Sequence, residues 1–71
     1  MTVVVERADG VVRATCFDVE ERAFAFALGL CVTNGDNSTE FMRDALEESN
    51  MYTCGFGDYF VAICYNVRKG E

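Results

Sequence analysis

The chain has 71 residues, with twelve acidic and six basic side chains, a net charge of −6 and no histidine. A chain of this length forms one domain, here residues 1–71, which buries only about 60% of the surface that its unfolded form exposes. The negative charge makes nucleic acid and anionic membranes poor partners, since both are polyanions, and favours a basic protein surface. Because histidine is absent, the usual general base near neutral pH is missing, so we expect no enzymatic activity and no catalytic residues.

Targeting and cysteine patterns indicate a soluble, cytoplasmic protein. Residues 1–10 contain no basic stretch, so no signal peptide is expected, and the longest apolar segment, residues 23–32, has about half the length that a membrane helix requires. The cysteines show no C-x-x-C spacing, and we expect reduced thiols rather than disulfides, with neither a metal site nor a cofactor. They are Cys16, Cys31, Cys54 and Cys64.

Residues 2–17 are predicted to form a β-hairpin around Asp9-Gly10, the favoured pair for a two-residue type I′ turn. One face of this hairpin is apolar and is expected to be the core, while the cross-strand charge pair of Glu6 with Arg13 marks the solvent side. The predicted register places Arg7 opposite Val12, Glu6 opposite Arg13, Val5 opposite Ala14 and Val3 opposite Cys16. The predicted core face consists of Val3, Val5, Val12, Ala14 and Cys16.

Residues 19–31 carry two patterns. Asp18 followed by Glu21 has the form of a capping box, and three alanines further favour a helix. Apolar residues alternate from Phe24 to Val32, which keeps a strand open as the alternative. We expect the helix, ended by a turn over residues 33–36. It would bury Val19, Ala23, Phe26, Ala27 and Leu30.

Residues 37–50 predict a second helix with two different faces. Asn37 is expected to be the N-cap, with Glu40 completing a capping box. An apolar stripe and a row of carboxylates then recur at helical spacing on separate faces. The stripe is Phe41, Met42, Ala45 and Leu46, and the row is Glu40, Asp44, Glu47 and Glu48.

Residues 51–55 and 59–67 predict a second hairpin, joined through Phe56-Gly57-Asp58. The last strand is apolar on both faces and is therefore expected to lie inside the sheet. The predicted fold is α+β, a four-stranded antiparallel sheet in the order ββααββ with two helices packed on one face. Small residues are expected on the inward faces, where they would let the helices approach closely. They are Ala14, Cys16, Ala62 and Cys64.

Two features are candidates for binding. Negative charge is concentrated between Asp36 and Glu48, which hold five acidic residues and one basic residue. Four residues of helix advance about 6 Å, comparable with two nucleotide steps of about 3.4 Å, so the acidic row is spaced to replace phosphates in a basic channel. The alternative is a solvated face that only confers solubility. Phe56, between two glycines, is the second candidate as an exposed aromatic anchor, unless it folds back over the core.

In size, charge and general build, over its full length, the chain resembles the small anti-CRISPR proteins of phages and mobile elements, and is similar to those that act on type I surveillance complexes. The resemblance implies an inhibitor that binds a basic DNA-binding surface of a Cas subunit and blocks access to target DNA, without binding nucleic acid or membrane itself. We expect the main contacts from Glu40, Asp44, Glu47 and Glu48, with additions from Glu20, Glu21, Asp36 and Asp58.

A rival interpretation comes from a different class of protein. The chain is then a non-enzymatic interaction module or a homo-oligomer, joined through an edge strand or the Phe56 turn. Both a monomer and a dimer remain open.

Overall fold

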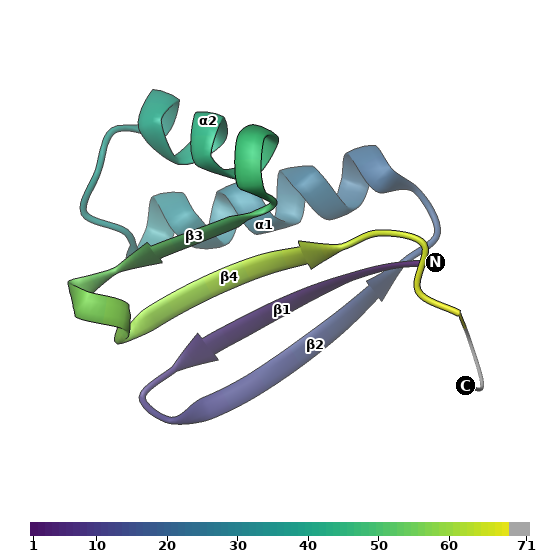
Figure 1. Ribbon diagram of the computed structural model, residues 1–71, viewed down its shortest axis with the longest axis horizontal. Coiled ribbons are helices and arrows are strands. Elements are labelled where there is room, and N and C mark those ends of the chain that lie inside the picture. Colours follow the sequence, from purple (N-terminus) through teal and green to yellow (C-terminus); the bar gives the residue numbers. More distant parts are fainter. Residues whose placement is uncertain (69–71) are drawn as a thin grey trace.

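The computed structural model describes residues 1–68 and has an α+β fold. A four-stranded antiparallel sheet has the order β2-β1-β4-β3, and two helices connect its first hairpin to its second (Figure 1). This confirms the predicted sheet and the element order ββααββ. The elements are β1 (Thr2–Ala8), β2 (Val11–Phe17), α1 (Glu20–Asn34), α2 (Thr39–Ser49), β3 (Met51–Cys54), the 3₁₀ turn η1 (Gly55–Gly57) and β4 (Tyr59–Cys64).

Both hairpins form where the sequence predicts them. Asp9 and Gly10 have φ angles of 52° and 79°, as a type I′ turn requires, and the predicted register of β1 with β2 is confirmed. In the second hairpin, β4 pairs with β3 on one side and with β1 on the other, so the strand predicted to be internal is internal. It ends at Cys64, earlier than the predicted residue 67.

The choice of core face in the first hairpin is wrong. Val4 is 1% exposed and belongs to the core, whereas Val12, Ala14 and Cys16 are exposed to solvent. We call the side of the sheet that carries Val4, Val61 and Ile63 the covered face, and the other side the open face. The open face consists of Val3, Val5 and Arg7 in β1, Val12, Ala14 and Cys16 in β2, Met51 and Thr53 in β3, and Phe60, Ala62 and Cys64 in β4.

Side-chain volume explains this reversal. β4 presents Tyr59, Val61 and Ile63 on the covered face and Phe60, Ala62 and Cys64 on the open face. The first set has the larger combined volume, so packing it against the helices removes more apolar surface from water. The predicted close approach of the helices over Ala14, Cys16, Ala62 and Cys64 is therefore wrong as well, because these side chains lie on the open face.

The charge pair of Glu6 with Arg13, which was expected to mark the solvent side of the hairpin, lies on the covered face. Glu6 stands opposite Arg13 near the hairpin turn, beside an open hollow, and neither side chain is fully buried. The hydroxyl of Tyr59 donates a hydrogen bond of 2.8 Å to Glu6 Oε2. The periphery of the covered face thus accommodates charge, which sequence alternation alone does not reveal.

Residues 20–34 form helix α1, which excludes the alternative of a strand. The helix begins after Val19, whose side chain makes no capping hydrogen bond, so the predicted cap at Asp18 is wrong. Its buried positions are Ala23, Ala27 and Cys31, a stripe of small residues that lets α1 lie close to the sheet. Phe26, expected to be buried, is 39% exposed and instead stacks obliquely on Phe17, with ring centroids 5.2 Å apart. Val19, also expected in the core, is 43% exposed.

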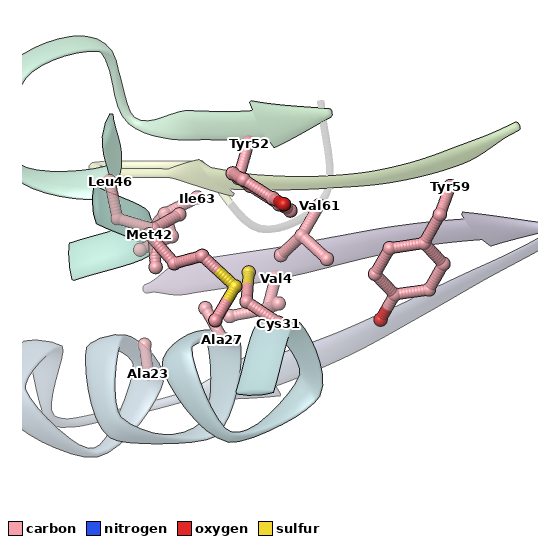
Figure 2. Packing of buried hydrophobic residues seen from close by; sticks show 10 residues of the cluster. All are labelled: Val4, Ala23, Ala27, Cys31, Met42, Leu46, Tyr52, Tyr59, Val61 and Ile63. Carbon is pink, nitrogen blue, oxygen red and sulfur yellow. The ribbon is translucent and has the colours of Figure 1, made fainter. Parts of the chain in front are cut away.

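The core is one cluster of ten buried side chains between the helices and the covered face (Figure 2). Gly35, between the two helices, permits this packing, because a Cβ there would lie 2.6 Å from the Cys31 carbonyl oxygen and 2.7 Å from Met42 Sδ. The helices supply Ala23, Ala27, Cys31, Met42 and Leu46, and the sheet supplies Val4, Tyr52, Tyr59, Val61 and Ile63.

Candidate functional site

The outer surface of α2 carries four carboxylates. Met42 and Leu46 are 2% and 0% exposed and anchor the opposite side of the helix in the core. At 3.6 residues per turn, the four acidic residues fall within an arc of about 100° that is centred opposite these two anchors. We call this set the acidic face of α2: Glu40, Asp44, Glu47 and Glu48, all exposed.

The helix that presents this face is capped at Ser38, one residue after the predicted cap. Ser38 Oγ accepts a hydrogen bond of 3.2 Å from the Phe41 amide. Asn37 has a different role: its Nδ2 donates a hydrogen bond of 2.7 Å to the hydroxyl of Tyr52. The cap and the tyrosine contact together fix where α2 begins relative to the sheet.

The acidic face of α2 is turned away from the rest of the protein. It extends about 12 Å along the axis from Glu40 to Glu48. Among residues 1–68, the carboxylates that accept side-chain hydrogen bonds are those of Glu6 and Asp36, and both lie outside this face. Arg43, the one base in α2, projects at the edge of the acidic arc. The carboxylates on this face are therefore accessible to an external cation.

The other predicted acidic contacts are dispersed. Glu20 and Glu21 are exposed in the first turn of α1, where their charge stabilises the helix N-terminus. Asp36 lies between the helices, and its Oδ1 accepts hydrogen bonds from Asn37 Nδ2 and the Tyr52 hydroxyl, at 3.2 and 3.3 Å. Asp58 follows η1 in the turn between β3 and β4. Only the four carboxylates of α2 share one helix face.

Phe56 projects fully into solvent from η1. Its exposed fraction is 111%, so it does not fold back over the core. Its φ angle is 58°, and the flanking Gly55 and Gly57 also have positive φ angles, of 59° and 92°. A positive φ is rare for an aromatic residue and costs about 1 to 2 kcal/mol. The turn therefore holds a large apolar side chain outward in a strained conformation.

Arg7 supports this turn, which sequence patterns did not indicate. Its Nη2 donates a hydrogen bond of 3.0 Å to the carbonyl oxygen of Gly57, and its guanidinium carbon lies 5.5 Å from the centre of the Phe60 ring. The contact joins residues fifty positions apart in the sequence. Only the pairing of β1 with β4 brings them together.

Two buried side chains, Cys31 and Tyr59, have raised pKa values. Burial raises the pKa of the Cys31 thiol to about 11, and the neighbouring Cys54 adds to the rise. Burial is the main cause that raises the pKa of the Tyr59 hydroxyl, and the hydrogen bond to Glu6 raises this pKa further. Within residues 1–68 no group of three or more His, Cys, Asp or Glu side chains is placed to hold a metal ion.

A hollow of about 300 Å³ lies beside the first hairpin turn and the end of α1. Glu6 and Arg13 provide charges of opposite sign in its lining, and Asn34 provides an amide. That amide is already engaged, since Asn34 Nδ2 donates hydrogen bonds to the Leu30 carbonyl and the Tyr59 hydroxyl, at 2.9 and 3.3 Å. The hollow is therefore a weaker candidate for binding than the acidic face of α2.

Comparisons with models of protein families, with curated proteins and with solved structures find no match to this chain. Among the described residues, neither helix has the length and apolar character needed to cross a bilayer. The candidate function therefore depends on the surfaces described above.

Proposed function

We propose that the chain is an inhibitor of the anti-CRISPR kind, acting in the cytoplasm of a host bacterial cell. It binds a basic DNA-binding surface on a Cas subunit of a type I complex and prevents target DNA from binding there. The acidic face of α2 replaces the DNA phosphates, on a scaffold in which both helices pack on one face of the sheet. The protein itself binds neither nucleic acid nor membrane.

One observation carries this proposal: four exposed carboxylates occupy a single face of α2, opposite the buried Met42 and Leu46. The two anchors hold the helix in the core, so little backbone conformational entropy is lost when the face meets a partner. A row of fixed negative charges attracts a channel lined with Lys and Arg over a distance of about 8 to 10 Å at moderate ionic strength. Binding is therefore expected to weaken strongly as salt rises.

The direct test uses purified type I surveillance complexes and measures their binding to target duplex DNA in the presence of the protein. The wild-type protein is expected to block DNA binding at low salt and much less at high salt. The double variant Glu40→Lys/Asp44→Lys should lose about 100-fold in inhibition, because two contacts become repulsive. Its thermal stability should stay close to that of the wild type, since both side chains are exposed.

A charge-matched comparison separates the acidic face from net charge. Glu20→Lys/Glu21→Lys changes the net charge by the same amount at the start of α1 and should cost much less inhibition. Equal losses in the two double variants would mean that overall charge matters and α2 does not. Loss of inhibition only in variants that also unfold would refute the proposal.

A second candidate is an interaction module or homo-oligomer that uses an edge strand and the Phe56 turn. The complete exposure of Phe56 in a strained conformation favours it, because strain of this kind is concentrated at functional positions. The edge strands β2 and β3 each pair with one neighbouring strand of the described sheet, so the outer side of each is available to pair with a strand of another chain. Under this function, Phe56→Ala abolishes partner binding, and the reversal of charge on α2 leaves it unchanged.

A further inference from the structure

The open face of the sheet is an apolar surface that neither helix covers. Of its eleven side chains, Arg7 and Thr53 are polar, and the rest are aliphatic, aromatic or cysteine. The edge-strand side chains Val12 and Met51 are 63% and 46% exposed, while Cys16 and Cys64 are exposed beside Val3. Both helices lie on the other side, against the covered face (Figure 1). Contiguous exposed apolar surfaces of more than a few hundred Å² mark interaction sites.

The sizes of the side chains on the open face are suited to packing against another sheet. Ala14, Val5, Ala62 and Met51 form one row across all four strands. Cys16, Val3 and Cys64 form the next row. Both rows consist mainly of alanine, cysteine and valine, and these short side chains allow two sheets to approach to about 10 Å, the separation of packed sheets in sandwich folds.

The area of the open face meets the lower limit for a specific dimer. Four strands spaced about 4.8 Å apart, with about six residues of about 3.3 Å each, give a flat area on the order of 400 Å². Pleating and side chains increase the accessible area, so two faces in contact bury on the order of 1,000 Å² in total. This size lies at the small end of specific protein–protein interfaces.

The distribution of charge favours a second copy of this chain as the partner that covers the open face. The open face contains no carboxylate although the chain has twelve acidic residues, and its one charged group, Arg7, is already engaged with Gly57 and Phe60. Two copies joined through their open faces keep their α2 helices on opposite outer sides, which minimises repulsion between two chains of net charge −6. An anionic lipid surface or nucleic acid would instead be repelled.

We propose that the protein forms a symmetric homodimer in which the open faces of two sheets pack against each other, leaving the acidic face of each α2 exposed. The assembly is independent of the function proposed for α2. It differs from an oligomer joined through an edge strand, because no strand pairing between copies is involved.

The test is sedimentation velocity under reducing conditions, from micromolar to millimolar protein. A reversible monomer–dimer equilibrium is expected for the wild type. Ala14→Glu places a carboxylate at an exposed position of the open face and should raise the dissociation constant about 100-fold or more, because a charge is left unpaired in the interface. Ala25→Glu makes the same substitution at an exposed position of α1 and should leave the equilibrium unchanged.

Alkylation of the cysteines locates the interface in the folded protein. Cys16 and Cys64 should react more slowly as the wild-type concentration rises, while Cys54, on the covered side of the sheet, should not respond. In Ala14→Glu, neither open-face cysteine should show this protection. A protein that remains monomeric at millimolar concentration, binding of the monomer to lipid vesicles through this face, or a dimer unaffected by Ala14→Glu would each overturn the proposal.

Discussion

The covered and open faces of the sheet have similar apolar composition but opposite roles. The covered face contributes Val4, Val61 and Ile63 to the core, while the open face leaves Val12 63% exposed. In an antiparallel sheet with a single helical layer, alternation divides the side chains into two sets without choosing which set is buried. The bulk of Tyr59, Val61 and Ile63 favours one set, and the other remains available for a partner.

The largest expected difference between the faces is in stability. Val4→Ala should lower the free energy of unfolding by about 2 to 3 kcal/mol, because Val4 is 1% exposed within the core. Val12→Ala, on the open face, should cost less than about 0.5 kcal/mol. Urea denaturation of both variants at low protein concentration makes the comparison. Similar losses in the two variants would mean that the open face is packed in the monomer.

The buried cysteine should make the protein sensitive to alkali. Burial raises the pKa of Cys31 from 9.0 to about 11, so the folded chain keeps a proton that the unfolded chain loses. The contribution of this thiol to the free energy of unfolding is therefore fully present below pH 9. As the pH rises towards 11, the free energy of unfolding should fall by on the order of 2 kcal/mol. Urea denaturation at several pH values measures this.

Two cysteine variants isolate the cause of this alkaline loss. Cys31→Ala should make the decline between pH 9 and pH 10 shallower, because the thiol, with an ordinary pKa of 9.0, titrates ahead of the buried Tyr52 and Tyr59, whose ordinary pKa is 10.0. Cys16→Ala removes an exposed thiol of the open face and should leave the decline as in the wild type. An unchanged slope in Cys31→Ala would show that burial of this thiol is not the source.

A smaller effect on stability is expected at the N-terminus of α2. Ser38→Ala removes the side-chain cap of α2 and should lower the free energy of unfolding by about 1 kcal/mol. Ser38→Asp restores an acceptor at the same position and should retain the stability of the wild type. Thermal denaturation with circular dichroism measures both variants; equal losses would mean that Ser38 does not act as the cap.

The smallest expected effect is at the turn, which belongs to neither face. Phe56→Gly should raise the free energy of unfolding by about 0.5 kcal/mol, because relief of the positive φ angle outweighs the added freedom of the unfolded chain. Phe56→Ala keeps the strain and should give no increase. If Phe56 anchors a partner, both variants lose binding, which separates the stability of the turn from its use.

The acidic face of α2 could be predicted from residues 37–50 alone, because helical periodicity places side chains three and four positions apart on one face. The exposure of Phe56 could not, since two glycines permit either an outward or an inward conformation. The contact of Arg7 with Gly57 could not either, because it depends on the pairing of β1 with β4. The position of the α2 cap was missed by one residue, because Tyr52 engages Asn37.

By itself the sequence determined the element order, the register around Asp9-Gly10 and the internal position of β4, because these follow from turn geometry and from hydrophobic patterns within short segments. Only the tertiary structure decided which side of the sheet the helices cover. That choice depends on the combined volume of side chains from all strands and both helices, which no single segment contains.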